Sequence, residues 1–391
     1  MKYIVLVGDG MADYPIPELG GLTPLQAADT PNMDFIAKHG KCGLARTVPD
    51  DKPPGSDVAN LSIMGYDPQK YYSGRGPLEA ASIGIKLQKD EIAFRCNLIT
   101  EKNGLLADYS SGHISSEEAG ILIKAVDKEL GNSCRFHAGV SYRHLLVMKQ
   151  GEFAQCTPPH DVVGQSIEDV MPHGESSEFL ISLIRDSKPI LENHEVNNNR
   201  KKAGKNVANL IWPWGQGRAP DMPLFKHMFG ISGSIISAVD LLKGIGKYAG
   251  LNIIDVPGAT GYLDTNFSGK AQYALASLKE RDFVLVHVEA PDEAGHMGNI
   301  EAKIKAIYDF DDKVVGGMLN ELGGFGDFKV MVLPDHPTPL SIRTHTREPV
   351  PFAIYSSTEK ADYVGNYDEF AAKEGIFGLI EGYMLMKLLI S

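Results

Sequence analysis

Three short apolar runs, each ending in glycine, proline or an acidic residue, constrain the fold of this chain most strongly. They read YIVLVGDG from Tyr3, FVLVHVEAPD from Phe283 and KVMVLPDH from Lys329. Short runs rich in Val, Ile and Leu and bounded by turn residues are typical of the buried strands of a parallel sheet. Helical patterns lie between them, so the sequence predicts an α/β fold with a mainly parallel sheet flanked by helices.

Four helical patterns contribute to this prediction. TPNMDFIAKHG predicts a helix capped by Thr30, SIISAVDLLKGIG predicts one that ends at Gly244, and IEAKIKAIYDFDDKVVGGML predicts a long helix from Ile300. MLMKLLI, residues 384–390, is too short to span a bilayer and predicts the buried face of a final helix.

The middle of the chain has shorter apolar segments, such as EIAFRCNLIT and YRHLLVMKQGEFAQC, which are typical of a smaller α+β unit. ENHEVNNNRKKAGKN, residues 192–206, is interpreted as a solvated loop. A chain of 391 residues exceeds one ordinary core. We therefore expect a core made of residues 1–72 and 219–391, interrupted by an inserted domain of residues 73–218.

Charge and cysteine content argue against several classes of protein, such as nucleic-acid-binding proteins. The formal net charge is −12, and the 38 Lys and Arg are spread among 50 Asp and Glu, which argues against a nucleic-acid partner. The four cysteines form no Cys-x-x-Cys pair and are expected to be reduced and mostly buried. The apolar run at the start is too short for a signal peptide, so a cytoplasmic protein without a membrane partner is expected.

Each of the three strand-like runs is followed by an aspartate, namely Asp9, Asp292 and Asp335. In α/β sheets the ligand site forms beyond the carboxyl ends of the strands. Three histidines accompany these carboxylates: His296 lies four residues after Asp292, His336 is adjacent to Asp335, and His345 precedes a further strand. Mixed oxygen and nitrogen ligands in this number suit two divalent ions of the Mn, Zn or Co type.

Each part of this pattern also has a structural interpretation. An isolated Asp-x-x-x-His pair is usually a surface pair, Asp335 fits a turn after Pro334, and Asp9 in GDGM fits ordinary turn chemistry. GDGMAD also lacks the spacing of a dinucleotide-binding fingerprint. The coincidence of all six residues at strand ends favours the metal site.

Ser56 in DKPPGSDVANLSIMGYD stands where a helix is predicted to begin. It is interpreted both as the N-cap of that helix and as a nucleophile, and the two roles are compatible. PPGSDVA lacks the Gly-x-Ser-x-Gly elbow of a serine hydrolase. A helix N-terminus beside a metal pair favours the arrival of a phosphoryl group.

The motifs VGDGMAD, PPGSDVANLSIMGYDP, GRGPLEAAS, APDEAGHMG and LPDHPTP resemble the archaeal-type branch of the cofactor-independent (2,3-bisphosphoglycerate-independent) phosphoglycerate mutases. That family belongs to the alkaline phosphatase superfamily of dimetal enzymes, and the resemblance covers nearly the whole chain. It implies a phosphatase-like core and an inserted substrate-holding domain. It also implies that Ser56 is transiently phosphorylated. The implied ligands of one metal are Asp9, Ser56, Asp335 and His336, and those of the other are Asp292, His296 and His345.

The resemblance implies two divalent metal ions, with Mn as the first choice and Zn, Co or Mg as alternatives, and no 2,3-bisphosphoglycerate. Arg75 and Lys243 are assigned catalytic roles at the phosphate, since a guanidinium or ammonium group suits phosphate oxygens. The predicted substrate contacts are His113, Arg143, Asp161 and Arg218, with Asp108 and His160 nearby in sequence. For each basic residue a surface ion pair is the alternative interpretation.

The resemblance implies an isomerase that interconverts 3-phosphoglycerate and 2-phosphoglycerate, a reaction of glycolysis and gluconeogenesis. Its partner is a small phosphorylated hydroxy acid, and the sequence leaves the oligomeric state open. Three alternatives remain: a homoserine kinase of the same branch, a metal-dependent phosphatase, and a protein that only binds.

Overall fold

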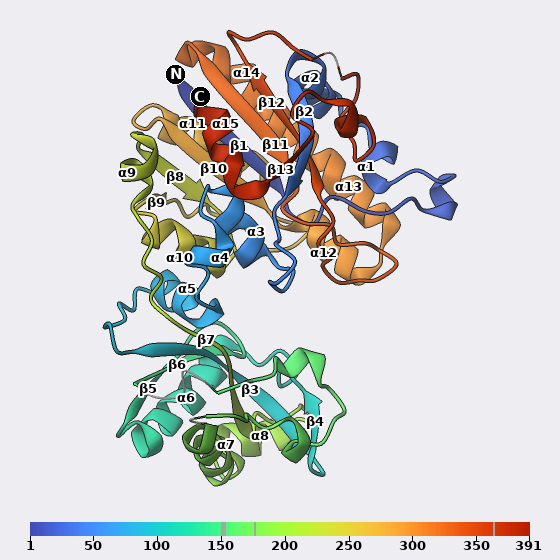
Figure 1. The fold of residues 1–391 in the computed structure, drawn as a ribbon. Coiled ribbons are helices and arrows are strands. Elements are labelled where there is room, and N and C mark those ends of the chain that lie inside the picture. The colour runs from blue at the N-terminus through green and yellow to red at the C-terminus, as the bar shows by residue number, and fades with distance from the viewer. Residues whose placement is uncertain (150–153, 176, 363) are drawn as a thin grey trace. The chain divides into compact units, whose positions relative to one another are not determined.

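The structure is a computed structural model that describes residues 1–149, 154–175, 177–362 and 364–391. It contains two compact units (Figure 1). Unit 1 comprises Met1–Tyr72 together with Asp221–Ser391, and unit 2 comprises Ser73–Pro220. Each unit has its own sheet and its own hydrophobic core.

Unit 1 is built on an eight-stranded sheet in the order β13-β2-β12-β11-β1-β10-β8-β9. Neighbouring strands run parallel except at the pairs β11 with β12 and β12 with β2. The fold class predicted from the sequence is therefore confirmed. The strands are β1 (Lys2–Gly8), β2 (Lys41–Arg46), β8 (Gly233–Ile236), β9 (Asn252–Ile253), β10 (Phe283–Val288), β11 (Phe328–Leu333), β12 (Val350–Ser356) and β13 (Leu379–Glu381).

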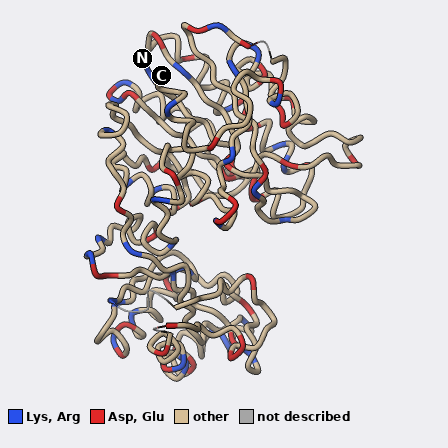
Figure 2. The backbone as a smooth tube through the Cα atoms, viewed as in Figure 1, with Lys and Arg blue, Asp and Glu red and all other residues tan. Residues whose placement is uncertain are grey.

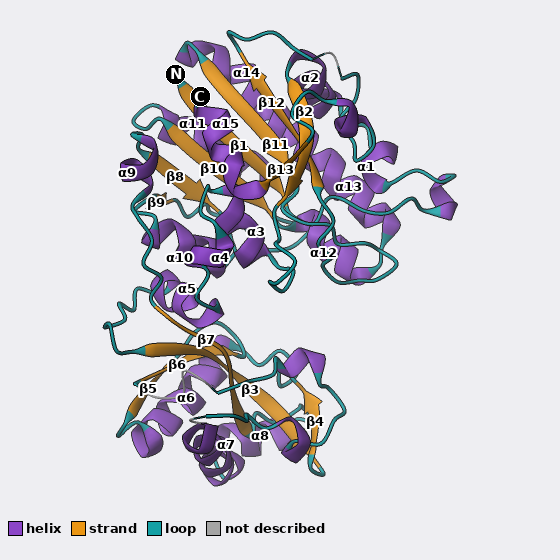
Figure 3. Cartoon of the chain, viewed as in Figure 1, coloured by secondary structure: helices purple, strands orange, loops and turns teal. Residues whose placement is uncertain are grey.

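Helices cover both faces of this sheet (Figure 3). One face is packed by α2, α11 and α14, and the other by α3, α10 and α15. The helices of unit 1 are α1 (Pro24–Ala27), α2 (Pro31–His39), α3 (Ser56–Ile63), α4 (Pro68–Tyr71), α9 (Phe225–Phe229), α10 (Asp240–Tyr248), α11 (Phe267–Leu278), α12 (Ala290–Met297), α13 (Ile300–Phe310), α14 (Gly317–Leu322) and α15 (Leu385–Ile390).

The three apolar runs form β1, β10 and β11, as predicted, and they are neighbours in the sheet. Their central residues are fully buried, because helices cover both faces of the sheet. The final helix is also confirmed, since α15 buries Leu385, Met386 and Leu389. The long helix from Ile300 is present too, but residues 311–316 form a π-helical turn between α13 and α14.

The helix predicted over SIISAVDLLKGIG is wrong in its first half. Residues 233–236 form strand β8, which pairs in parallel with β10, and α10 begins only at Asp240. Adjacent isoleucines, Ile235 and Ile236, are both fully buried here, one towards each face of the sheet. A short apolar run of this kind is compatible with a buried strand and with a buried helix segment. Residues 233–236 form a strand because they pair with β10.

The N-terminus of α2 is capped from a distant part of the chain. Thr30 occupies the N-cap position, but its side chain makes no capping hydrogen bond, so the predicted role of Thr30 is wrong. The carboxylate of Asp311 accepts instead from the backbone N–H groups of Met33, at 2.7 Å, and Asn32, at 3.2 Å. Two of the donors that a helix start leaves unsatisfied are thereby paired.

We expect Asp311→Ala to lower the free energy of unfolding by about 1–3 kcal/mol, because it leaves buried N–H donors without a partner. Thr30→Ala removes no capping bond and is expected to cost only about 0.5 kcal/mol. Denaturant unfolding of both variants at pH 7.5 measures the difference. A larger loss for Thr30→Ala than for Asp311→Ala would show that Thr30 caps the helix after all.

Unit 2 contains a five-stranded antiparallel sheet in which β3 pairs with β4, β6 and β7. Helix α5 packs on one side, against β3 and β7, whereas α7 packs against β7 and α6 against β5. The strands are β3 (Ile92–Lys102), β4 (Leu105–Asp108), β5 (Cys134–His137), β6 (Arg143–Met148) and β7 (Leu210–Arg218). The helices are α5 (Arg75–Ser82), α6 (Ser116–Leu130), α7 (Ser177–Glu192) and α8 (Glu195–Lys202).

Two sequence segments of unit 2 can be compared with their predictions. EIAFRCNLIT forms β3 and YRHLLVM forms β6, whereas residues 150–153 lie outside the described residues. The solvated loop predicted over residues 192–206 is wrong, because residues 195–202 form α8. Asn197 and Arg200 of this helix are buried, and Arg200 pairs with Glu118 at 2.6 Å. Tertiary contacts of two polar residues thus anchor a segment whose composition resembles a loop.

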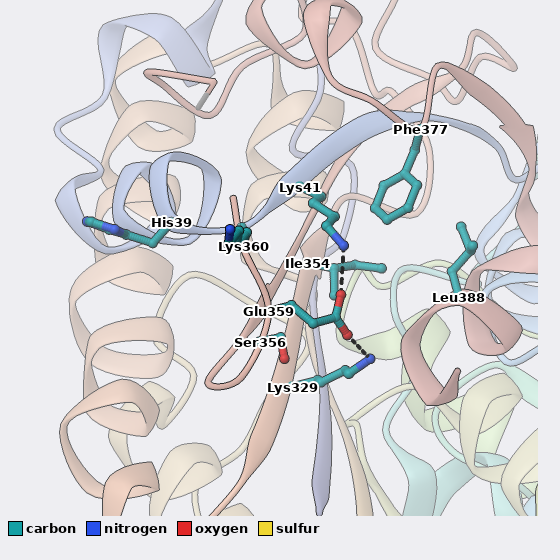
Figure 4. A pocket seen from close by; sticks show the side chains of 10 residues that line it. His39, Lys41, Lys329, Ile354, Ser356, Glu359, Lys360, Phe377 and Leu388 are labelled. Atoms are coloured by element: carbon teal, nitrogen blue, oxygen red, sulfur yellow. Dashed lines mark hydrogen bonds and ion pairs between the residues drawn. The ribbon is translucent and has the colours of Figure 1, made fainter. Parts of the chain in front are cut away.

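Positions of Lys and Arg are interspersed with positions of Asp and Glu along the described backbone of both units (Figure 2). A small cavity of unit 1 illustrates how they pair (Figure 4). Lys41 begins β2 and Lys329 lies near the start of β11, and both ammonium groups contact the carboxylate of Glu359. The charged residues that line this cavity therefore form a structural ion cluster.

Candidate metal centre

The three aspartates predicted at strand ends lie at one edge of the sheet in unit 1. Asp9 directly follows β1, Asp335 lies two residues after β11, and Asp292 lies in the first turn of α12, which follows β10. Because β11, β1 and β10 are adjacent and parallel, their carboxyl ends bring the three carboxylates together. All three side chains are buried.

One group of ligand atoms is formed by Asp292, His296 and His345. Nε2 of His296 lies 3.2 Å from Oδ2 of Asp292 and 3.0 Å from Nε2 of His345. Nδ1 of His296 lies 3.0 Å from the backbone carbonyl of Arg343, which can only accept a hydrogen bond. Nδ1 therefore carries the proton, and in the neutral ring the lone pair of Nε2 points at the other two ligands.

A second group lies around Asp9, Asp335, His336 and Ser56. Oγ of Ser56 lies 3.1 Å from Nε2 of His336 and 3.4 Å from Oδ2 of Asp9. Nε2 of His336 is 3.5 Å from Oδ1 of Asp9 and 3.6 Å from Oδ2 of Asp335. The residues expected to hold one metal ion thus lie within ligand-to-ligand distance of one another.

The pKa directions of these groups reflect their burial and mutual charge. Burial raises the pKa of Asp9 well above its usual value, and the negative charges of Asp335 and Asp292 raise it further. Burial lowers the pKa of His336 to about 4 in spite of the nearby Asp335. Burial also disfavours charged His296, but the hydrogen bond and charge of Asp292 raise the pKa of His296 to about 9. Positive charge beside Asp9, Asp292 and Asp335 would therefore stabilise these closely packed carboxylates.

Divalent ions fit this set of residues. Oδ1 of Asp9 and Nε2 of His287 are buried and make no hydrogen bond among the described residues. The Nε2 atoms of His296 and His345 lie 3.0 Å apart. Two electron-rich nitrogens are therefore in contact unless a cation or a proton lies between them. Carboxylate oxygens with imidazole nitrogens are the donors that Mn, Zn and Co accept.

Ser56 is the first residue of α3, and Gly55 occupies the N-cap position. Because Gly55 and not Ser56 is the N-cap, the interpretation of Ser56 as the helix cap is wrong. The hydroxyl of Ser56 is directed to Asp9 and His336 instead. Nδ2 of Asn60 donates to the carbonyl oxygen of Ser56 at 2.9 Å and to Oδ2 of Asp335 at 2.8 Å, which ties the first turn of α3 to a predicted metal ligand.

We expect Asn60→Ala to lower kcat/KM of the mutase reaction that the family resemblance implies by about 10–100-fold. Such a loss is typical when a residue that orients a metal ligand is removed. The matched control is Ser115→Ala, which removes the N-cap bond of α6 in unit 2. That control is expected to lose about 1 kcal/mol of stability and to keep its turnover. Equal turnover of the two variants would show that Asn60 does not position the centre.

Several side chains at the centre were missed by the sequence analysis. Thr338 donates a short hydrogen bond from its hydroxyl to Asp292. His287 lies on β10 with its Nε2 3.3 Å from Oδ2 of Asp9, and Glu289 and Lys270 form a buried ion pair beside it. A signal for His287 was present, because a polar residue interrupts the apolar run FVLVHVEAPD. Glu289 follows two residues later, directly after the end of β10.

The other predicted site residues are divided between the units. Lys243 lies on α10 of unit 1, where its Nζ pairs with Oδ1 of Asp255 at 2.7 Å. Arg75 begins α5 of unit 2, and its guanidinium lies 5.5 Å from the ring centroid of Trp214. Arg218 ends β7 and donates from Nη1 to the carbonyl oxygen of Lys89 at 3.0 Å.

A chain of aromatic rings connects two of the four predicted substrate contacts, His113 and Arg143, with other residues of unit 2. The ring of Tyr142 contacts His113 at a centroid distance of 6.0 Å, and the guanidinium of Arg143 lies 5.8 Å from the same ring. Ring contacts continue in the order Tyr142, Tyr109, His160 and Trp214. Trp214 also contacts Arg75 and Arg95. Successive ring contacts thus link His113 and Arg143 to His160 and Arg75.

The two predicted aspartates of unit 2 differ in their surroundings. Asp161 is exposed, with Oδ1 3.6 Å from Nε2 of His160. Asp108 accepts hydrogen bonds from the backbone N–H of Ser110, at 2.8 Å, and from Nδ2 of Asn206, at 2.7 Å. These bonds give Asp108 a role in fixing its turn.

Comparison with known proteins gives a consistent result. A family model described as 2,3-bisphosphoglycerate-independent phosphoglycerate mutase matches residues 37–197. Proteins with that name from Methanosarcina acetivorans and Methanosarcina barkeri are 58% and 56% identical to this chain, and each alignment covers 100% of the chain and at least 99% of the relative. A probable enzyme of the same name from Geobacter sulfurreducens is 51% identical, with 100% of both proteins covered.

Solved structures agree with these relatives. The cofactor-independent phosphoglycerate mutase from Thermoplasma acidophilum superposes with a TM-score of 0.68 at 28% identity, covering 100% of this chain and 99% of that one. A protein from Pyrococcus horikoshii reaches a TM-score of 0.85 at 31% identity, covering 100% of this chain and 96% of the other. On its fold and on relatives that match it from end to end, this chain belongs to the family of 2,3-bisphosphoglycerate-independent phosphoglycerate mutases.

Proposed function

We propose that this protein interconverts 3-phosphoglycerate and 2-phosphoglycerate through a phosphoserine at Ser56, with no added 2,3-bisphosphoglycerate. The observation that carries the proposal is the position of the Ser56 hydroxyl at the start of α3, 3.1 Å from His336 and 3.4 Å from Asp9. Full-length relatives that carry the name of this activity support it. A serine needs a neighbouring base or cation to become a nucleophile, and Ser56 lies beside an imidazole and a carboxylate that could act as a base or hold a cation.

The proposed reaction has two phosphoryl transfers. In the first, Oγ of Ser56 loses its proton and attacks phosphorus, and the bond between phosphorus and O3 of the substrate breaks. O3 keeps the electron pair and takes up a proton, which leaves glycerate and phosphoserine. In the second transfer O2 of glycerate loses its proton and attacks the phosphoserine, which returns the hydroxyl of Ser56. No phosphate is consumed or released.

Two divalent ions fit the ligand groups described above, with Mn as the first choice and Zn, Co or Mg as alternatives. Asp9, Ser56, Asp335 and His336 would hold one, and Asp292, His296 and His345 the other. When bound, such ions supply positive charge that stabilises the transferring phosphoryl group. Arg75 and Lys243 are proposed to add cationic charge at the phosphate oxygens.

We propose that unit 2 is the substrate-holding domain and unit 1 the metal-binding core. A mutase must retain glycerate between the two transfers, whereas a phosphatase needs only water. Arg143 and Arg218 suit the substrate carboxylate, because a guanidinium forms bidentate hydrogen bonds with a carboxylate. His113 or Asp161 is proposed to move the proton of the glycerate hydroxyl.

The proposed partner is a small phosphorylated hydroxy acid. None of the helices in the described part of the chain combines the length and apolar character needed to cross a bilayer. All four cysteines are free thiols. Free thiols are typical of a reducing compartment, so we propose a cytoplasmic location.

The test incubates the Mn-loaded protein with 3-phosphoglycerate in one tube and with ATP and L-homoserine in another, and follows both by phosphorus NMR. We expect 2-phosphoglycerate in the first tube, little free phosphate, and no reaction in the second. Steady release of phosphate in the first tube would indicate a phosphatase. Reaction only in the second tube would overturn the proposal in favour of a kinase.

A further inference from the structure

His287 is a buried histidine that the proposed ligand groups leave out. It lies on β10, between β1 and β8 in the sheet, and pairs in register with Val7. Its side chain is fully buried. Nε2 lies 3.3 Å from Oδ2 of Asp9 and 3.8 Å from Oδ2 of Asp335. The ring therefore faces two of the aspartates that form the metal centre.

The other face of this imidazole is held by a fixed set of partners. Nδ1 lies 3.2 Å from Oε1 of Glu289, and the same oxygen accepts from the hydroxyl of Ser237 at 3.1 Å and from the backbone N–H of Ala238 at 3.0 Å. Oε2 of Glu289 lies 2.9 Å from Nζ of Lys270, which also donates to the carbonyl oxygen of His287 at 2.7 Å. The charges of Glu289 and Lys270 cancel, so this pair adds no net charge beside His287. Its effect is to hold the imidazole ring in one orientation.

This arrangement determines which nitrogen carries the proton. Glu289, paired with an ammonium group, is a carboxylate and can only accept a hydrogen bond. Nδ1 of His287 therefore donates to Glu289, and in the neutral ring Nε2 presents a lone pair towards Asp9 and Asp335. The distances of 3.3 and 3.8 Å to their oxygens are longer than an ordinary N–H···O hydrogen bond. Nε2 also has no hydrogen-bond partner among the described residues.

A lone pair that faces two carboxylates in a buried site is stabilised when a cation, either a proton or a metal ion, lies between the nitrogen and the carboxylate oxygens. Asp9, His287 and Asp335 each offer one ligand atom, and these three atoms lie within 4.8 Å of one another. Histidines that bind metals usually donate their second ring nitrogen to a carboxylate, as His287 does to Glu289. We propose that Nε2 of His287 is a direct ligand of the divalent ion held by Asp9 and Asp335, and that Glu289, Lys270 and Ser237 orient it.

This assignment changes the expected selectivity of the centre. With His336, it would give the ion two imidazole nitrogens and two carboxylate oxygens besides the serine. Imidazole nitrogen favours Mn, Zn and Co over Mg, which prefers oxygen ligands and water. The inference rests on the metal centre of the proposed function, but it concerns binding of the ion alone and involves no substrate.

The test uses a background variant, His296→Ala with His345→Ala, in which only the centre at Asp9 and Asp335 keeps its histidines. X-ray absorption of the Zn-loaded background counts imidazole ligands without any change at His287. We expect two imidazole nitrogens, from His287 and His336, and a count of one overturns the inference. This measurement stands even if substitution of the buried His287 prevents folding.

Variants at His287 then give a second readout, the affinity for Mn measured calorimetrically without substrate. We expect His287→Gln to weaken binding at least about 100-fold and Glu289→Gln, which keeps the shape but removes the charge, to weaken it about 10–100-fold. His227→Gln, on the exposed face of α9, is the matched control and should bind as the background does. Affinity within threefold of the background for His287→Gln overturns the inference.

Failure of the inference differs from failure of the proposed function. If the wild-type protein binds Mn and converts 3-phosphoglycerate while His287→Gln binds Mn normally, only the role of His287 is wrong. If the wild-type protein binds no divalent ion, both are wrong.

Discussion

Ser56→Ala should lose phosphoenzyme formation completely and lower turnover by at least about 10⁴-fold, as is typical when a covalent nucleophile is removed. The same substitution should leave the free energy of unfolding within about 0.5 kcal/mol of the wild-type value. The reason is that Ser56 is the first residue of α3 and not its N-cap, and that among the described residues its hydroxyl contacts Asp9 and His336. If Ser56 were the N-cap of α3, the same substitution would cost about 1 kcal/mol of stability.

The measurement combines turnover, mass spectrometry of the protein after incubation with 3-phosphoglycerate, and denaturant unfolding. Ser62→Ala is the matched control, because Ser62 lies on the same helix and is buried, but belongs to neither ligand group. This control should keep turnover within about tenfold and still form the phosphoenzyme. A phosphorylated Ser56→Ala protein would place the acceptor on another residue and would contradict the proposed mechanism.

The positions of the main candidate ligand residues were predictable because they follow from strand order along the sequence. An aspartate that directly follows a buried parallel strand must lie at the carboxyl edge of the sheet, which places Asp9 and Asp335 without knowledge of any side-chain contact. His296 follows from the spacing of four residues after Asp292 on one helical turn. The resemblance to a family assigned these residues to two ions.

The parts that could not be predicted depend on contacts between distant segments. Asp311 caps α2 from 279 residues further along the chain, and no local pattern shows which distant carboxylate replaces Thr30. Lys270 and Glu289 read as two ordinary charged residues, and only the packing of α11 against β10 makes them a buried pair. His287 was hidden for a related reason, since one polar residue in a strand is compatible with either a structural or a ligand role.

Removal of the metal ions should reveal how much the packed carboxylates strain the fold. In the ion-free protein Asp9 has a raised pKa because it is buried and lies beside Asp335 and Asp292. A raised folded-state pKa stabilises the fold below the unfolded pKa, and that contribution is lost as pH rises through the folded pKa. We therefore expect chelation to destabilise the protein more at pH 8 than at pH 5.5, and to abolish turnover at both.

Asp9→Asn should have opposite effects on stability and on activity. Replacing a buried carboxylate that lies among like charges by a neutral amide should make the ion-free protein more stable than ion-free wild type, by about 1–3 kcal/mol at pH 8. Turnover should fall at least about 10³-fold, because Asp9 contacts both Ser56 and His336. Asp221→Asn, at an exposed position of unit 1, is the control and should change neither quantity. Denaturant unfolding with and without chelator measures the difference. If ion-free Asp9→Asn were less stable than ion-free wild type, the three carboxylates would not repel one another as the structure indicates, and the argument that they require cations would lose its electrostatic basis.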